Sequence, residues 1–132
     1  MKIKSGRKAV HAENKKIAVI EEIADDIYSI KYILRSIGYN VESFSSQDSY
    51  QDALVEFAPQ LVIIDMMISG GQAFRVMEEM GKSRFKKVPI LAITAEAMEG
   101  EEQDVYQAGG QDVLSKPYEV SDLRKKIKKW IK

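Results

Sequence analysis

Polar side chains follow four of the short strand-like runs in this 132-residue sequence. They are Glu21 and Glu22 after residues 17–20, Asp65 after residues 61–64, Thr94 after residues 90–93, and Lys116 after residues 112–115. A carboxylate that ends a buried run is costly unless a partner or a cation meets it. Asp65 taken alone has a simpler interpretation, a charge that marks where its strand reaches water. Complementary polar groups at several strand ends indicate a site instead.

The three carboxylates predict a site for a hard cation. Clustered carboxylates repel, and each would stay protonated unless a cation neutralises them. Oxygen ligands without His or Cys suit Mg²⁺ or Mn²⁺ rather than zinc, and Mg²⁺ commonly binds carboxylates together with phosphate oxygens. Lys116 offers a point charge and Thr94 a hydroxyl donor, both suited to phosphoryl oxygens. Asp65 is the candidate nucleophile for an aspartyl phosphate.

Alternating strand-like and helix-like runs predict the fold that would position these groups. The strand-like runs are residues 17–20, 41–44, 61–64, 90–93 and 112–115, and the helix-like runs are about 25–37, 46–58, 72–80, 98–108 and 120–132. Strict alternation favours an α/β fold with a parallel sheet covered on both faces, and right-handed crossovers make it doubly wound. Such sheets bind ligands beyond the carboxyl ends of their strands, where the polar groups lie.

The last helix-like run is strongly basic. We expect it to bury Val120, Leu123 and Ile127, which follow helical spacing. Its cations are expected to face water: Arg124, Lys125, Lys126, Lys128, Lys129 and Lys132. They could bind a phosphate backbone, but cations near a helix carboxyl terminus are favourable in themselves, so a solvated face is the preferred interpretation.

The composition describes a single globular domain. Twenty basic and twenty acidic residues balance, so neither nucleic acid nor a membrane is expected as a direct partner. No run approaches the roughly 20 apolar residues of a spanning helix. The absence of cysteine excludes disulfides and fits a reducing cytosol, so a cytoplasmic location is expected. One histidine, His11, leaves no histidine-based metal cluster or triad.

Residues 1–14 are basic and polar, and no apolar stretch follows them as in a secretory signal. We expect a loosely ordered leader there, with a basic docking arm as the alternative, and one folded domain over residues 15–132.

Residues 16–132 resemble the receiver domain of two-component response regulators, the family of the single-domain chemotaxis regulator. The matching motifs, in chain order, are Val19-Ile20-Glu21-Glu22, Ile63-Ile64-Asp65-Met66-Met67, Ile93-Thr94-Ala95 and Ser115-Lys116-Pro117. Each motif alone is weak, but their order and placement on alternating elements make the set specific. The resemblance implies a flavodoxin-like sheet of five parallel strands in the order 2-1-3-4-5, with helices on both faces.

The resemblance also implies a metal site. Glu22, Asp65 and the backbone carbonyl of Met67 would ligate Mg²⁺, and Glu21 would reach the ion through water. Asp65 would accept a phosphoryl group from a histidine kinase or a histidine phosphotransfer protein. Lys116 would contact that group.

Thr94 is implied to move toward the phosphoryl group on activation, and the Lys116–Pro117 bond is expected to be cis. Three features depart from the family pattern: Glu21-Glu22 in place of an aspartate-containing pair, Ser69 and Gln72-Ala73 in the loop after Asp65, and Val113 at the aromatic switch position. A threonine–aromatic relay cannot run through valine, so an output signal must use other contacts or be muted.

These observations support three hypotheses. The first is a stand-alone receiver that phosphorylates and dephosphorylates itself with Mg²⁺ and signals by protein contact, since no sequence remains for a DNA-binding domain. The second is a degenerate receiver, an interaction module that works without phosphorylation. The third is a phosphohydrolase of the haloacid-dehalogenase type, which is disfavoured because Met67 stands where that class carries a second aspartate.

Overall fold

Five strands and five helices alternate along the chain in the computed structural model, which describes residues 15–21, 24–45, 50–67, 72–95 and 99–131. The strands are β1 (Lys16–Ile20), β2 (Asn40–Phe44), β3 (Leu61–Asp65), β4 (Ile90–Thr94) and β5 (Asp112–Ser115). The helices are α2 (Ala24–Ser36), α3 (Tyr50–Phe57), α4 (Gln72–Gly81), α5 (Glu99–Ala108) and α6 (Val120–Trp130). The predicted alternation is confirmed. The predicted leader, residues 1–14, lies outside the described residues.

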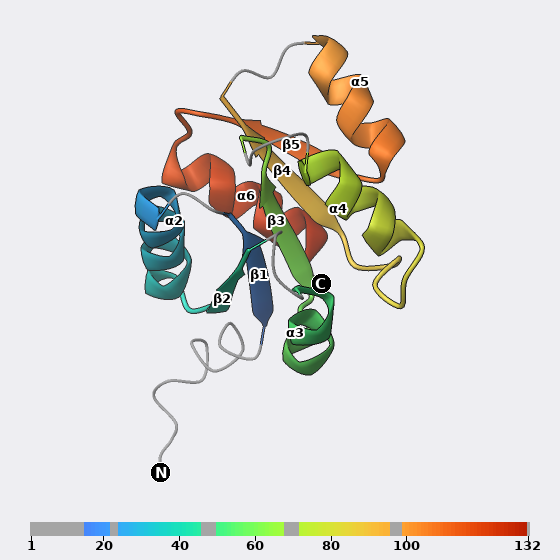
Figure 1. Ribbon diagram of the computed structural model, residues 1–132. Coiled ribbons are helices and arrows are strands. Elements are labelled where there is room, and N and C mark those ends of the chain that lie inside the picture. Colours follow the sequence, from blue (N-terminus) through green and yellow to red (C-terminus); the bar gives the residue numbers. More distant parts are fainter. Residues whose placement is uncertain (1–14, 22–23, 46–49, 68–71, 96–98, 132) are drawn as a thin grey trace.

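All strand pairs are parallel, and the sheet order is β2-β1-β3-β4-β5 (Figure 1). This confirms the doubly wound sheet with the order 2-1-3-4-5. Ile20 pairs with Ile64, and Asp65 pairs with Ile93, so the carboxyl ends of the three central strands lie side by side. The order reverses at β1 and β3, which places Asp65 at the switch point where such sheets bind ligands.

The sheet has an apolar core on each face because its strand residues alternate in direction. Ile17 and Val19 of β1 belong to the cluster that α2 and α6 cover, while Ala18 and Ile20 belong to the cluster under α3, α4 and α5. The same alternation holds along β3 and β4. Continuous apolar runs are therefore needed in the central strands, as the sequence has them.

The helix ends follow simple backbone chemistry. Gly38 ends α2 with a φ of 102°, and the next amide, that of Tyr39, donates to the Leu34 carbonyl at 3.1 Å. Ala58 ends α3 in the same left-handed region, with a φ of 55°, directly before Pro59. Alanine there carries a steric cost that glycine avoids.

Two predictions for the last helix are wrong. Val120 is 46% exposed, because the first turn of α6 precedes the part of the helix that packs on the sheet through Leu123. Lys126 is not simply a solvated cation, since its Nζ lies 2.8 Å from Asp112 Oδ1, and Lys129 Nζ lies 3.9 Å from the other carboxylate oxygen. Asp112 is buried at the start of β5, and a buried charge needs partners.

Among the described residues, no helix is long and apolar enough to cross a lipid bilayer.

Candidate functional site

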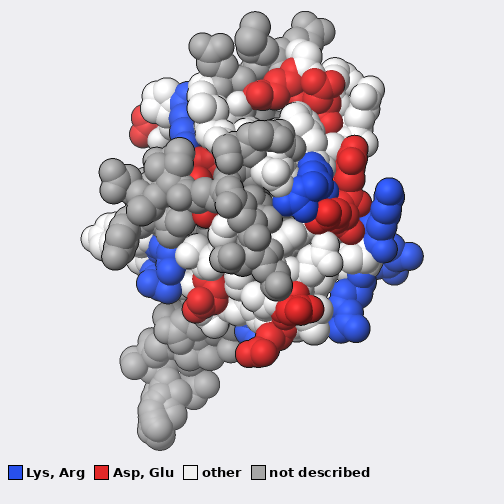
Figure 2. Space-filling model, viewed as in Figure 1, with Lys and Arg blue, Asp and Glu red and all other residues white. Residues whose placement is uncertain are grey.

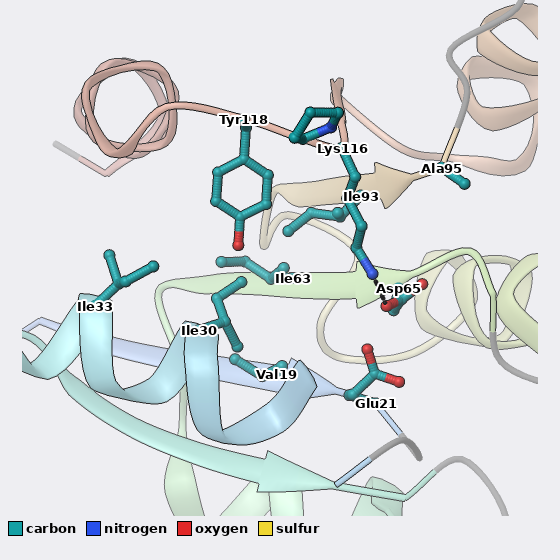
Figure 3. A pocket seen from close by; sticks show the side chains of 11 residues that line it. Val19, Glu21, Ile30, Ile33, Ile63, Asp65, Ile93, Ala95, Lys116 and Tyr118 are labelled. Atoms are coloured by element: carbon teal, nitrogen blue, oxygen red, sulfur yellow. Dashed lines mark hydrogen bonds and ion pairs between the residues drawn. The ribbon is translucent and has the colours of Figure 1, made fainter. Parts of the chain in front are cut away.

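Three charged side chains from different strands meet at the carboxyl edge of the sheet (Figure 3). Glu21 follows β1, Asp65 ends β3, and Lys116 follows β5. Each lies two residues beyond a core residue of the face that α2 and α6 cover, so strand alternation turns all three the same way. Glu21 is 3% exposed and Asp65 is 4% exposed. Two carboxyl groups are therefore buried together.

Asp65 is held by two donors. Its Oδ2 lies 2.9 Å from Lys116 Nζ, and its Oδ1 accepts the backbone N–H of Met67 at 2.7 Å. Burial would raise the pKa of Asp65, but hydrogen bonds with Glu21, Lys116 and Met67, together with the Lys116 charge, outweigh it and hold that pKa below its usual range. Asp65 is thus an ionised carboxylate at neutral pH.

The donor set fits a hard divalent cation. The buried carboxyl groups of Glu21 and Asp65 are in hydrogen-bond contact. Two carboxylates this close repel each other, and a bound cation offsets that repulsion. The ligands available are oxygens, which Mg²⁺ and Mn²⁺ prefer.

The predicted metal ligands are only partly described. Glu22 lies outside the described residues, and within the described ranges there is no group of three or more His, Cys, Asp or Glu side chains that could hold a metal ion. Met67 is described next to Asp65, with its side chain 55% exposed. The pair that the structure brings together is Glu21 and Asp65.

Thr94 points away from this group. Alternate residues of a strand point to the same face of the sheet, and Ala92 and Ile90 of β4 face α4 and α5. Thr94 comes two residues after Ala92 and therefore points to that face as well. The Thr94 hydroxyl donates a hydrogen bond to Glu101 Oε1 of α5. The sequence alone does not single out Glu101, because an acidic residue early in a helix is explained by the helix dipole. Its position seven residues after a strand-end threonine is the signal that the sequence contains.

Apolar side chains wall the site on one side. They line a hollow of about 560 Å³ that ends at Glu21, Asp65 and Lys116. Figure 3 shows Ile63 and Tyr118 beside this hollow, with Tyr118 coming from the segment after β5. An apolar wall lowers the local dielectric and strengthens the attraction between Lys116 and Asp65.

The departures from the family pattern have structural consequences. Val113 is buried in the cluster that contains Val105 and Met77, and its side chain has no polar atom to bond Thr94. In the loop after Asp65, Ser69 lies outside the described residues, and α4 begins at Gln72. The Lys116–Pro117 bond is cis, as expected.

One protein family matches this chain. Residues 17–128 match the response regulator receiver domain. The phosphate regulon transcriptional regulatory protein of Rhizobium meliloti is 26% identical over 114 residues, which are 86% of this chain and 50% of that protein. Its Escherichia coli counterpart is 24% identical over 115 residues, with the same shares. The chain spans about half the length of the curated relatives it matches.

Solved structures have the same fold. A receiver domain of a sensor histidine kinase from Pseudomonas aeruginosa, with a magnesium ion in its active-site cleft, is 26% identical, with a TM-score of 0.77 over 89% of this chain and 97% of that one. A chemotaxis protein of Vibrio cholerae is 19% identical, with a TM-score of 0.79 over 88% of this chain and 98% of that one.

Proposed function

Since this chain belongs to the response regulator receiver family, we propose that Asp65 accepts a phosphoryl group in a reaction that uses Mg²⁺. One observation carries the proposal. The buried, ionised carboxylate of Asp65 lies 2.9 Å from the Lys116 ammonium and in hydrogen-bond contact with a second carboxyl group, that of Glu21. A nucleophile, a cation and a metal-binding oxygen set therefore occupy one small volume.

The chemistry is a phosphoryl transfer from a phosphohistidine to a carboxylate. A carboxylate oxygen of Asp65 attacks the phosphorus of a phosphohistidine, and the phosphorus–nitrogen bond breaks with its electron pair left on the imidazole. The product is an acyl phosphate on Asp65. Attack of water on the same phosphorus returns the carboxylate and releases inorganic phosphate. Lys116 would exchange its bond to Asp65 for one to a phosphoryl oxygen.

Mg²⁺ would be held by Asp65, Glu22 and the Met67 carbonyl, and Glu21 would reach the ion through water, with Mn²⁺ able to use the same oxygen ligands. When bound, the ion supplies positive charge that offsets the charge of the phosphoryl oxygens.

The proposed donor is a histidine kinase or a histidine phosphotransfer protein, and the proposed output partner is a protein. A balanced set of twenty basic and twenty acidic residues gives no electrostatic reason for direct contact with nucleic acid. A cytoplasmic location, expected from the cysteine-free composition, is part of this proposal.

Acetyl phosphate with Mg²⁺ tests the proposal, with phosphoprotein resolved on a phosphate-affinity gel. The parent is expected to gain one phosphoryl group, Asp65→Asn none, and the parent with a chelator none. Asp52→Asn is the matched control, because Asp52 is an exposed aspartate of α3 and the chemical change is the same. Labelling of Asp65→Asn at the parental level would refute Asp65 as the acceptor.

A degenerate receiver is the second candidate, and Val113 favours it, because no aromatic relay from Thr94 can operate there. Titration with Mg²⁺ followed by NMR separates the two. Shifts of the Asp65 and Met67 amides at millimolar Mg²⁺ support the phosphorylated receiver. Their absence, together with no labelling, supports a phosphorylation-independent interaction module.

A further inference from the structure

The Thr94 hydroxyl is bonded to α5. It donates to Glu101 Oε1, and Thr94 itself is 2% exposed, so this bond is protected from water on the threonine side. A hydrogen bond to an ionised carboxylate is charge-assisted and stronger than one between neutral groups.

A hydroxyl group has one proton to donate. Thr94 follows Ile93, and Ile93 pairs with Asp65 across β3 and β4. A phosphoryl group on Asp65 would therefore bring strong acceptor oxygens to the strand end next to Thr94. The hydroxyl cannot donate to Glu101 and to such an oxygen at the same time, so the two acceptors compete for it.

The two ends of α5 are held in different ways. At the carboxyl end, Val105 is buried, and its carbonyl accepts the Gly110 amide at 2.9 Å. Nearer the amino end, none of the described residues 100–104 is buried. Figure 2 shows acidic side chains gathered at the end of the molecule where α5 lies. Charged side chains are rarely buried without a partner. The Thr94–Glu101 hydrogen bond joins this half of the helix to the sheet.

We propose that Glu101 is a latch on Thr94. Its carboxylate holds the Thr94 hydroxyl on the α5 side, and phosphorylation of Asp65 breaks this hydrogen bond and so frees the amino-terminal half of α5 from the sheet. The latch does the work that the aromatic relay cannot do through Val113. This inference rests on the proposed function, because it needs an acceptor group on Asp65. Glu101 acts through Thr94 and is a positioning residue.

Linkage makes the latch measurable. If binding at Asp65 breaks the Thr94–Glu101 hydrogen bond, the free energy of that bond opposes binding. Removing Glu101 must then raise the affinity at Asp65 by the factor to which that free energy corresponds. A charge-assisted hydrogen bond of this kind corresponds to roughly a tenfold change in an equilibrium constant.

Beryllofluoride with Mg²⁺ is the probe, because it imitates a phosphoryl group without turnover. Its apparent dissociation constant is measured for the parent, Glu101→Ala, Thr94→Ala and the double variant. Glu102→Ala is the matched control, since Glu102 is the next residue of the same helix and carries the same charge. Hydrogen exchange of the amides of residues 101–105 in the ligand-free proteins gives a second readout.

We expect Glu101→Ala to bind beryllofluoride about tenfold more tightly than the parent and to exchange faster in residues 101–105. Glu102→Ala should match the parent in both. In the Thr94→Ala background, Glu101→Ala should change the affinity by less than about twofold, because the latch acts through that hydroxyl.

The failures are distinguishable. A folded parent that does not bind beryllofluoride with Mg²⁺ would refute the proposed phosphoryl site, and the latch with it. Parent binding with equal affinities for Glu101→Ala and Glu102→Ala would refute only the latch. A tenfold effect that persists without the Thr94 hydroxyl would also refute it, because Glu101 would then act by another route.

Discussion

Asp112→Asn should weaken the attachment of α6 to the sheet. Asp112 is 6% exposed, and its carboxylate accepts hydrogen bonds from Lys126 Nζ at 2.8 Å and from Trp130 Nε1 at 2.9 Å. It also accepts the Val113 amide at 2.9 Å. One buried carboxylate at the start of β5 therefore joins two side chains of the last helix to the edge strand.

The cost follows from the bonds that an amide cannot make. The amide oxygen can still accept one or two of these bonds, but the charge that attracts Lys126 is lost. The Lys126 side chain is 32% exposed, so water can replace part of that attraction, and the loss is about 1 kcal/mol. A second weakened hydrogen bond adds about 1 kcal/mol. The free energy of unfolding should fall by about 2 kcal/mol, out of roughly 5–15 kcal/mol for a domain.

The loss should depend on pH in one direction. Burial would raise the pKa of Asp112, but hydrogen bonds from Lys126, Trp130 and Val113, with the Lys126 charge, lower it below the unfolded value of 3.8. A carboxyl whose folded pKa is depressed stabilises the protein above the unfolded pKa, and that stabilisation is lost as the pH falls through the folded pKa. The difference in the free energy of unfolding between the parent and Asp112→Asn should be constant near neutral pH and should shrink below about pH 4.

The assay is urea unfolding followed by tryptophan fluorescence. Trp130 is the only tryptophan, and its indole N–H is one of the bonds in question. The slope of the free energy of unfolding against urea concentration should be unchanged, and only the midpoint urea concentration should fall. Asp104→Asn, at an exposed aspartate of α5, is the control and should match the parent. An equal difference in the free energy of unfolding between parent and variant at pH 7 and pH 3 would refute the role assigned to the carboxylate charge.

Three further substitutions test the packing around the sheet, each by its effect on the free energy of unfolding. Gly110→Ala should lower it by about 1–3 kcal/mol, because a Cβ at Gly110 would overlap Val105 Cγ1, and an unchanged midpoint urea concentration would contradict this. Ala58→Gly should raise it by about 0.5–1 kcal/mol, because the residue has a φ of 55°, and a lower midpoint would count against the strain. Tyr50→Phe should lower it by about 1 kcal/mol, because the hydroxyl of Tyr50 donates to Glu79. In the parent, burial and then the Glu79 hydrogen bond raise the pKa of Tyr50 to about 12, so an ultraviolet titration that finds every tyrosine ionised near pH 10 would contradict that contact.

Part of the candidate site could be predicted because it depends on strand ends alone. Glu21, Asp65 and Lys116 follow runs whose apolar pattern marks them as strands, and parallel strands bring their carboxyl ends to one edge. Their side chains then meet because alternate residues of a strand point to the same face, and all three point to the face that α2 and α6 cover. The place of Thr94 could not be predicted in this way, since its partner lies on a helix and depends on how α5 packs.

The last helix shows the same division. Its apolar spacing predicts the burial of Leu123 and Ile127, which are both fully buried. The sequence does not distinguish Lys126 from its neighbouring cations, because only the position of Asp112 on the adjacent strand selects it. Val120 fits the periodic pattern but is exposed, because periodicity does not say where the sheet ends.

The sequence by itself determined the order of strands and helices, the faces of most elements, and the identity of the charged groups at the strand ends. These properties depend on local periodicity and on rules that hold for every parallel sheet. Only the tertiary structure decided which side chains contact one another across elements. Asp65 has Lys116 and Glu21 as partners, Thr94 has Glu101, and Asp112 has Lys126. Such pairings depend on packing between segments distant in sequence, and no local pattern encodes the distance between them.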